Sequence, residues 1–236
     1  MSVKCAVIVF PGSNCDQDNV RSWRAVTGLA AELVWHKERS IDNYDLIIIP
    51  GGFSFGDYLR TGAIARFSPI MSEVARLAGQ GRLVLGICNG FQILTEARLL
   101  PGALIRNRNL KYLCRDVLLR VENNNTAFTS DYRNGQVIRI PISHGEGGYS
   151  AGPRDLQALL DDDRVLLRYC AADGSVSPDD APNGSMLNIA GIINKKGNVF
   201  GLMPHPERLA EEELGGADGR AMFTSILKTL IGGSAR

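Results

Sequence analysis

The residues best suited to chemistry in this sequence surround a cysteine, Cys88, which stands between Gly86 and Gly90. An apolar run, 83–87, ends at this cysteine, and another apolar run follows it. This pattern predicts a strand, a sharp turn and a helix, because small residues two positions to either side let the central side chain project above the sheet edge. A helix starting at about Asn89 would direct its free N–H groups at the sulfur and favour the thiolate. Cys88 is therefore the candidate nucleophile, the alternative being a buried apolar cysteine at a strand end.

A thiolate nucleophile needs a base and a group that orients the base. His205 stands between two prolines, which favour an extended backbone, and Glu207 follows two residues later. In an extended segment these side chains project to the same side, so the carboxylate could hold one imidazole nitrogen while the other faces the nucleophile. Of the remaining histidines, His144 could line a pocket, and His36 is expected to be a solvated surface residue. The predicted catalytic residues are therefore Cys88, His205 and Glu207.

The elements that must position these side chains alternate in the first half of the chain. Apolar runs and amphipathic patterns predict, in chain order, strand 3–10, helix 17–27, strands 33–35 and 46–49, helix 68–78 and strand 83–87. This order is typical of a doubly wound, mostly parallel α/β sheet flanked by helices, with the site at the carboxyl ends of the strands. Gly51 and Gly52 follow the third strand, where they allow close approach to a ligand or form a plain tight turn.

The second half of the chain favours an antiparallel or mixed sheet, because its apolar runs are shorter and are separated by turns. The predicted strands are 114–121, 136–142, 164–170, 190–194 and 199–202. A loop is expected at 173–184, which is rich in Asp, Pro, Gly and Ser. Asp218 is expected to cap a last helix, 219–230, before a frayed tail, 232–236.

Length and composition limit the class of protein. The chain has 236 residues, 44% of them hydrophobic, and a net charge of +1. These values favour one domain spanning residues 1–236 and give no reason to expect nucleic acid as a ligand. No leader pattern and no bilayer-length apolar stretch is evident, so we expect a cytoplasmic protein with no membrane partner. Five cysteines without a C-x-x-C pair indicate reduced thiols and predict no metal site.

Several motifs carry a resemblance to a known family. The sequence Gly-Ile-Cys-Asn-Gly-Phe-Gln at 86–92, together with Pro-His-Pro-Glu at 204–207, resembles the class I (triad) glutamine amidotransferases, in which Cys, His and Glu hydrolyse the side-chain amide of glutamine. More narrowly, Gly-Ser-Asn-Cys-Asp at 12–16, Gly-Gly-Phe-Ser-Phe-Gly-Asp-Tyr-Leu-Arg at 51–60 and Met-Pro-His-Pro-Glu-Arg at 203–208 resemble the small glutaminase subunits of phosphoribosylformylglycinamidine synthases. The resemblance covers nearly the whole chain.

The resemblance adds substrate-binding residues to the three catalytic ones. It implies that Gln92 and the segment Ser143, His144 and Gly145 hold the amino-acid part of glutamine. The oxyanion of the reaction needs backbone donors, most simply the N–H groups of Asn89 and Gly52. The set of predicted substrate-binding residues is therefore Gly52, Asn89, Gln92, Ser143, His144 and Gly145.

The sequence also indicates what this chain lacks. It contains neither a G-x-x-x-x-G-K-[ST] loop nor a G-x-G-x-x-G run, so an ATP-driven ligation is not expected here. By the resemblance, the ammonia passes to a large synthetase subunit that makes formylglycinamidine ribonucleotide with ATP and Mg²⁺ in purine biosynthesis, and a small third subunit joins the complex. No cofactor is expected in this chain. Phe55, Tyr58 and Arg60 are the expected exposed contacts for the partner, near an oxyanion turn that could switch by a peptide flip.

Other functions share parts of this pattern. A stand-alone thiol hydrolase or peptidase on a similar α/β fold would have the same elbow and a histidine. A glutaminase subunit could serve a different synthetase, and a catalytically silent binding subunit would need no triad. The intact Cys88, His205 and Glu207 argue against the silent subunit.

Overall fold

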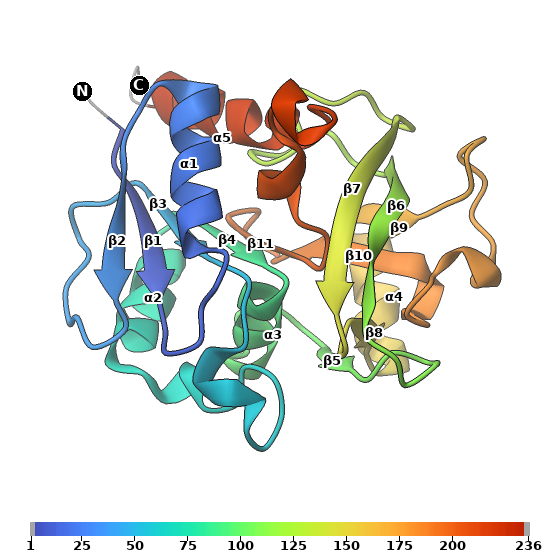
Figure 1. Ribbon diagram of the computed structural model, residues 1–236, viewed down its shortest axis with the longest axis horizontal. Helices are drawn as coiled ribbons and strands as arrows, with labels where there is room; N and C mark the ends of the chain where they lie inside the picture. The colour runs from blue at the N-terminus through green and yellow to red at the C-terminus, as the bar shows by residue number, and fades with distance from the viewer. Residues whose placement is uncertain (1–2, 234–236) are drawn as a thin grey trace.

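The computed structural model describes residues 3–233, which form one large twisted sheet with helices packed against it and a small two-stranded sheet (Figure 1). The strands are β1 (Cys5–Val9), β2 (Ala31–Trp35), β3 (Leu46–Ile49), β4 (Leu83–Ile87), β5 (Ala103–Ile105), β6 (Leu113–Val121), β7 (Val137–His144), β8 (Gly148–Ser150), β9 (Val165–Tyr169), β10 (Ile189–Ile193) and β11 (Val199–Leu202). The α-helices are α1 (Asp16–Thr27), α2 (Pro69–Gly79), α3 (Asn89–Glu96), α4 (Pro153–Asp161) and α5 (Arg220–Gly233). Within the described residues, no helix is long and apolar enough to cross a bilayer.

The first half of the main sheet is parallel. Its order is β2-β1-β3-β4-β11, and all four pairings between these neighbours are parallel. The chain moves in opposite directions from β1 to β2 and from β3 to β4, so right-handed crossovers place α1 and α2 on opposite faces. β1, β3 and β4 are buried almost throughout, as continuous apolar runs require in a sheet covered on both faces. The doubly wound parallel fold predicted from the sequence is confirmed.

The second half of the sheet is antiparallel, as predicted. The order continues from β11 through β10, β9, β6 and β7, and each of these pairings is antiparallel. The predicted strand 199–202 matches β11, and the other predicted strands differ from the observed ones by at most two residues at either end. β11 belongs to both halves, because it pairs in parallel with β4 and in antiparallel with β10. Because β11 is parallel to β4, the residues that follow β11 lie at the same edge of the sheet as the end of β4.

The sequence prediction missed some elements and misplaced others. Helix α4 was not predicted, although Pro153 at its first position and apolar residues at 156, 159 and 160 are signals for a helix. The last helix begins at Arg220, and the Asp218 carboxylate accepts the N–H of Arg139 at 2.7 Å instead of standing next to the helix as its cap. Residues 232 and 233 of the expected tail are helical, and residues 234–236 lie outside the described chain.

His36 is not the solvated residue that the sequence indicated. It is 6% exposed, and its ring packs against Phe10, Trp35 and Phe55. Its Nδ1 forms a 3.0 Å hydrogen bond with Oγ of Ser68. Burial lowers the pKa of His36, and the charge of the neighbouring lysine adds to this effect. Polar neighbours in the sequence gave no sign that the loop after β3 folds over this ring.

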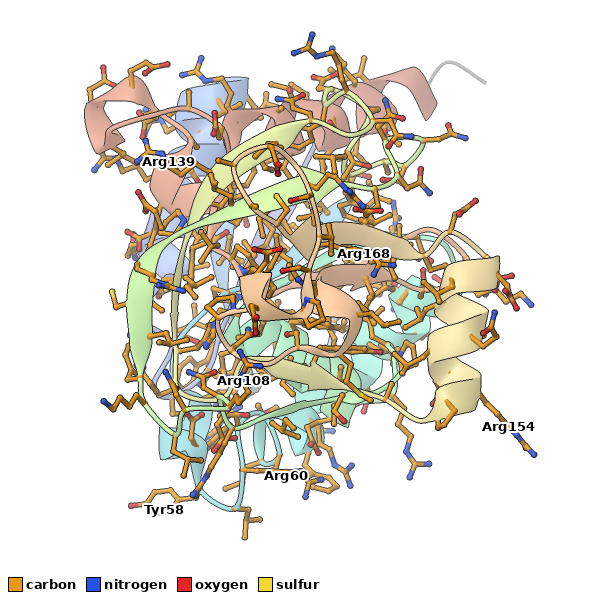
Figure 2. All side chains as sticks on the ribbon, turned by 90° about the vertical axis from the view of Figure 1, so that its right-hand side faces the viewer. Tyr58, Arg60, Arg108, Arg139, Arg154 and Arg168 are labelled. Atoms are coloured by element: carbon orange, nitrogen blue, oxygen red, sulfur yellow. The ribbon has the colours of Figure 1, made fainter. Side chains whose placement is uncertain are left out.

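The same loop ends in an exposed tip. Tyr58 is 75% exposed and Leu59 is 89% exposed, and Figure 2 shows Tyr58 and Arg60 at one end of the molecule. Arg60 is bound to the Glu96 carboxylate by two hydrogen bonds of 2.5 and 2.7 Å. Phe55, in contrast, is half-buried against the core, so the prediction that it is exposed was wrong.

Candidate active site

Cys88 lies in the predicted sharp turn between β4 and α3. Its φ of 52° and ψ of −106° are unfavourable for a residue with a side chain, which is typical of a strained functional turn. A Cβ on Gly90 would lie 1.9 Å from the carbonyl oxygen of Ile49, and a Cβ on Gly86 would lie 2.8 Å from the Gly90 backbone. Only glycine fits at either position, as the sequence argument required. The turn leaves the Cys88 sulfur at the carboxyl edge of the sheet.

Strand pairing brings His205 to the same edge. β11 runs parallel to β4 with Leu202 opposite Ile87, so the residues that follow both strands lie side by side. The N–H of His205 donates to the carbonyl of Pro141 at 2.8 Å, which fixes the backbone against β7. His205 Nδ1 and Glu207 Oε1 are 2.6 Å apart, and both residues are 2% exposed.

The route by which the carboxylate reaches the ring differs from the prediction. Glu207 lies in a 3₁₀ turn, Pro206–Leu209, and not in an extended segment. Pro206 ends the extended backbone because its fixed φ suits the first position of a helical turn. The two side chains meet within that turn, so the expected pair is present with a different backbone.

The surroundings of His205 favour its protonated form. Burial opposes a charge on the ring, but the Glu207 carboxylate and the Cys88 sulfur outweigh it and raise the pKa of His205 well above its usual value. Within residues 3–233, His205 Nε2 is buried and has no hydrogen-bond partner. A small cavity of about 40 Å³ is lined by both Cys88 and His205. The thiol and the free ring nitrogen therefore face the same space.

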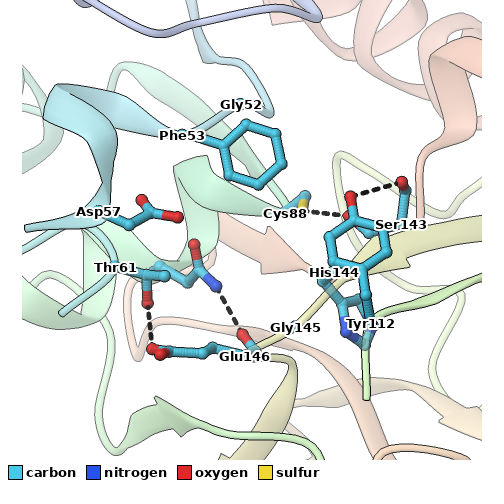
Figure 3. A pocket seen from close by; sticks show the side chains of 11 residues that line it. Gly52, Phe53, Asp57, Thr61, Cys88, Tyr112, Ser143, His144, Gly145 and Glu146 are labelled. Carbon is cyan, nitrogen blue, oxygen red and sulfur yellow. Dashed lines mark hydrogen bonds between the residues drawn. The ribbon is translucent and has the colours of Figure 1, made fainter.

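A larger cavity of about 180 Å³ opens beside Cys88 (Figure 3). Five of the six predicted substrate-binding residues line it, and Asn89 does not. The lining residues are Gly52, Phe53, Asp57, Thr61, Cys88, Gln92, Tyr112, Ser143, His144, Gly145 and Glu146. They come from the loop after β3, the elbow and α3, the residue that precedes β6, and the end of β7 with the loop that follows it. The structure thus brings together segments that lie far apart in the sequence.

Two of the predicted substrate-binding side chains form hydrogen bonds with other residues of the chain. Gln92 donates from Nε2 to the carbonyl of Glu146 at 2.5 Å and accepts from Nδ2 of Asn89 at 2.9 Å. His144 Nδ1 forms a 3.0 Å hydrogen bond with Oδ1 of Asn107. Burial, with a smaller effect from His205, lowers the pKa of His144 to about 4. Both side chains form the wall of the cavity through these internal contacts.

Ser143 contributes to the wall through two of its oxygens. Its Oγ shares a 2.8 Å hydrogen bond with the hydroxyl of Tyr112, and its carbonyl accepts from the Cys88 sulfur at 3.6 Å. Tyr112 was not predicted as a site residue, since it precedes a strand and has no motif around it. The carbonyl contact gives the Cys88 side chain a defined direction.

Two carboxylates in the cavity were also missed. Asp57 points into the cavity in Figure 3, and its Oδ1 is buried without a hydrogen-bond partner among the described residues. Burial, and secondarily the charge of Glu146, raises the pKa of Asp57 to about 6. Glu146 Oε2 accepts from the Thr61 hydroxyl at 3.2 Å. Their positions inside glycine-rich motifs were the available signal, because such loops approach ligands closely.

The turn at Gly51 and Gly52 is tied to the loop that follows β1. The carbonyl of Gly51 accepts from the N–H groups of Asn14 and Cys15 at 3.3 and 3.2 Å, and the N–H of Phe53 donates to the carbonyl of Gly12. In a trans peptide the C=O and N–H point in opposite directions, so the Gly52 N–H is directed away from residues 14 and 15. These hydrogen bonds hold the peptide in one orientation in this structure, and the flip expected from the sequence stays a prediction.

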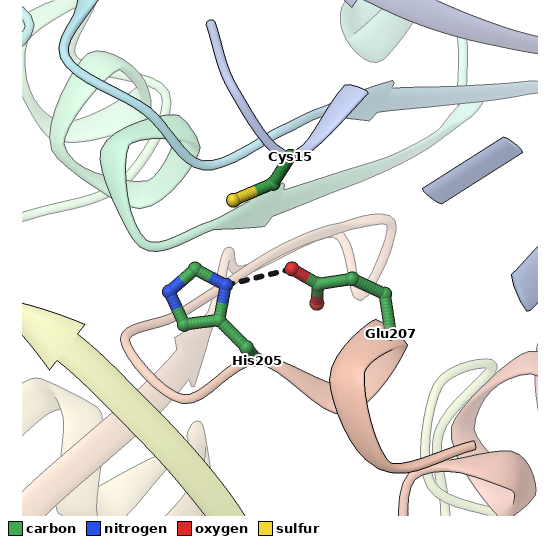
Figure 4. Close-up of side chains that lie close together, drawn as sticks. All are labelled: Cys15, His205 and Glu207. Atoms are coloured by element: carbon green, nitrogen blue, oxygen red, sulfur yellow. Dashed lines mark hydrogen bonds and ion pairs between the residues drawn. The ribbon is translucent and has the colours of Figure 1, made fainter. Parts of the chain in front are cut away.

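One group of side chains has the chemistry of a metal site. Cys15, His205 and Glu207 each offer a ligand atom, and these atoms lie within 4.8 Å of one another (Figure 4). A thiol, an imidazole and a carboxylate are ligands that Zn²⁺ accepts. The hydrogen bond between Glu207 Oε1 and His205 Nδ1 occupies two of these donors, however. The contacts of this group are those of a hydrogen-bonded His–Glu pair with a buried thiol beside it.

A sheet of this order, with a strained cysteine elbow and a buried His–Glu pair at its carboxyl edge, defines the class of protein. The family model for the CobB/CobQ-like glutamine amidotransferase domain matches residues 2–215, and the chain belongs to this family. Curated relatives carry a more specific name. The chain is 56% identical over 227 residues to the phosphoribosylformylglycinamidine synthase subunit PurQ of Salinibacter ruber, covering 96% of this chain and 97% of that protein. The corresponding subunit of Moorella thermoacetica is also 56% identical, with 95% of each chain covered.

Solved structures give the same result. The structure of PurLQS from Thermotoga maritima contains a chain with a TM-score of 0.86 and 47% identity, which covers 98% of this chain and 100% of that one. A glutamine amidotransferase from Thermotoga maritima matches with a TM-score of 0.58 at 15% identity, covering 98% of this chain and 99% of that one, which shows the common fold alone.

Proposed function

We propose that this chain is the glutaminase subunit of a phosphoribosylformylglycinamidine synthase, and that residues 1–236 form one glutamine amidotransferase domain. The observation that carries the proposal is the buried pair of His205 and Glu207 beside the strained Cys88 turn, in a chain whose relatives have this name over nearly their full length. The reaction is hydrolysis of glutamine to glutamate and ammonia.

The side chains of the triad account for the bond changes. The Cys88 thiolate attacks the side-chain carbonyl of glutamine, and the tetrahedral intermediate expels ammonia, which takes its proton from His205. A thioester on Cys88 remains. Water then attacks the thioester, with His205 accepting its proton, and glutamate leaves. Glu207 holds the ring through Nδ1 and stabilises the imidazolium whenever the ring is protonated.

Two backbone donors are available for the oxyanion. The N–H of Asn89 is at the first position of α3, where no preceding turn supplies an acceptor. The N–H of Gly52, a residue that lines the cavity, is oriented by the hydrogen bonds to the Gly51 carbonyl. We infer that the oxyanion binds between these two groups, since donors fixed in advance need no reorganisation during the reaction.

The charge of the cavity supports an amino acid as the substrate. Asp57 and Glu146 place two carboxyl groups on the side of the cavity remote from His205. We infer that they receive the α-ammonium group of glutamine, which the unpartnered Oδ1 of Asp57 would then bind. Gln92, Ser143, His144 and Gly145 would shape the pocket around the rest of the amino acid.

The ammonia must be used elsewhere. The relative from Thermotoga maritima comes from a PurLQS structure, and the proposed partners are accordingly a large synthetase subunit, together with a small third subunit. ATP and Mg²⁺ would act on the larger of these partners. A thiol, an imidazole and a carboxylate suffice for amide hydrolysis, so we propose that this chain needs no cofactor of its own.

The test is the Cys88→Ala variant in the assembled complex. We expect glutamine-dependent synthesis to be abolished, while synthesis from added ammonium salt continues at the wild-type rate. Cys114→Ala, which changes an exposed cysteine on β6, is the matched control and should retain both activities. Loss of the ammonium-dependent reaction in Cys88→Ala would contradict the proposal, as would retained use of glutamine. Hydrolysis of peptides in preference to glutamine would instead identify a thiol peptidase.

A further inference from the structure

The motif at residues 12–16 places a second buried thiol against the triad, and the reaction described above does not use it. Cys15 is 1% exposed. Its sulfur lies beside His205 and Glu207, as Figure 4 shows. A Cβ added to Gly51 would lie 2.7 Å from His205 Cε1 and 3.0 Å from the Cys15 sulfur, so the ring and the thiol pack against the same backbone.

The contacts of Cys15 are those of a neutral thiol. Burial raises the pKa of this thiol, and the neighbouring His205 ring offsets only part of the increase. The S–H group donates to Oδ1 of Asn14 at 3.1 Å, and the sulfur accepts from Nη2 of Arg208 at 3.1 Å. Cys15 therefore binds the guanidinium without adding a negative charge beside the imidazole ring.

Arg208 also contacts a second residue, Asp18, and a nearby carboxylate oxygen of Glu207 could compete for its guanidinium. Its Nε donates to Oδ2 of Asp18 at 3.3 Å. Arg208 and Glu207 line the same cavity of about 210 Å³ near α1. Oε2 of Glu207 is buried and has no hydrogen-bond partner within residues 3–233. A guanidinium and a carboxylate strongly favour a paired, fork-like contact, so an unanchored Arg208 would be drawn to this oxygen.

We propose that Cys15 is a positioning residue for the triad: its sulfur holds the Arg208 guanidinium away from Glu207, so that the carboxylate stays with Nδ1 of His205. If Arg208 captured Glu207, the imidazolium would lose much of the negative charge that stabilises it. The ring would then release its proton at a lower pH. This inference rests on the proposed function, because it concerns the same triad.

The groups that face His205 define what a pH profile reports. They are Cys88 from the elbow, Cys15 from the position just before α1, Glu207 from the 3₁₀ turn and His144 from β7. His144, with a pKa of about 4, is uncharged near neutral pH. A shift of the alkaline limb in a Cys15 variant therefore reports a change at the Cys88, His205 and Glu207 triad.

The experiment measures glutaminase kinetics against pH for Cys15→Ala and Cys15→Ser in the assembled complex. For Cys15→Ala we expect kcat to fall about tenfold with little change in KM, and the alkaline limb of kcat/KM to move about one unit lower. Cys15→Ser should restore most of the rate, since a hydroxyl can also donate to Asn14 and accept from Arg208. Cys114→Ala controls for loss of a thiol elsewhere.

A double variant separates positioning from packing. In an Arg208→Gln background there is no guanidinium to capture Glu207, so Cys15→Ala should cause little further loss. An equal loss in both backgrounds would overturn the proposal, as would an unchanged pH profile or equal damage from Ala and Ser. Thermal unfolding of each variant identifies any loss of activity that comes from misfolding. If Cys15→Ala does not fold, the kinetics of Cys15→Ser decide whether Cys15 positions the triad. A wild-type chain without glutaminase activity would instead contradict the proposed function itself.

Discussion

Replacing Glu207 by glutamine tests the electrostatic part of the triad without removing its geometry. The wild-type carboxylate lies 2.6 Å from His205 Nδ1, and its side chain is 0% exposed. A glutamine at this position has nearly the same shape and can still accept the Nδ1–H hydrogen bond through its amide oxygen. The variant therefore removes one buried negative charge while the ring keeps an acceptor.

The expected magnitude follows from the distance between the two charges. Taking the centres of the imidazolium and the carboxylate as about 4 Å apart, their attraction is about 4 kcal/mol at an effective dielectric constant of 20. Because this attraction to Glu207 holds the pKa of His205 well above its usual value, the pKa should fall when the charge is removed. The thiolate–imidazolium pair would then be scarce at neutral pH, and we expect the glutaminase rate to fall about a hundredfold to a thousandfold.

The assay measures glutamate release by the assembled complex over a range of pH, with ammonium-dependent synthesis measured in parallel. The second activity should be unchanged, since it does not use the triad. Glu211→Gln is the matched control: that carboxylate is a near neighbour in sequence, but it pairs with Arg21 at 3.4 Å. Wild-type turnover in Glu207→Gln would refute the reasoning, because the imidazolium would then need no charged partner.

Two further predictions concern the pocket and the elbow. Asp57→Asn should raise the KM for glutamine about tenfold or more, as expected when a charged hydrogen bond to the substrate is lost. In the wild type, affinity should weaken as the pH falls through the Asp57 pKa of about 6, because the carboxylate becomes neutral, and this dependence should be reduced in the variant. Asp155→Asn on α4 is the control. An unchanged KM in Asp57→Asn would show that Asp57 does not bind the substrate. Gly90→Ala should lower the free energy of unfolding by about 1–3 kcal/mol, because its Cβ would overlap the Ile49 carbonyl. Gly79→Ala, whose Cβ would contact nothing within 4 Å, should have little effect in the same denaturation assay, and equal stability of both variants would contradict the steric argument.

The sequence by itself determined the elements whose causes are local. Apolar runs and glycines fixed β4, the Cys88 turn and the start of α3, because burial patterns and backbone sterics depend on residues a few positions apart. The pairing of His205 with Glu207 was also local, although Pro206 starts a 3₁₀ turn that the expected extended segment did not include. Amphipathic spacing gave α1 and α2 within one residue of their observed ends.

Only the tertiary structure decided which distant residues meet. The parallel pairing of β11 with β4 puts His205 beside Cys88, and no local pattern encodes that register. Burial of His36 depends on a loop that folds over it from elsewhere in the chain. Asp57 and Glu146 are separated by 88 intervening residues but line one cavity. Contacts of this kind are set by the free energy of the whole fold, since packing one segment determines which surface remains for the next.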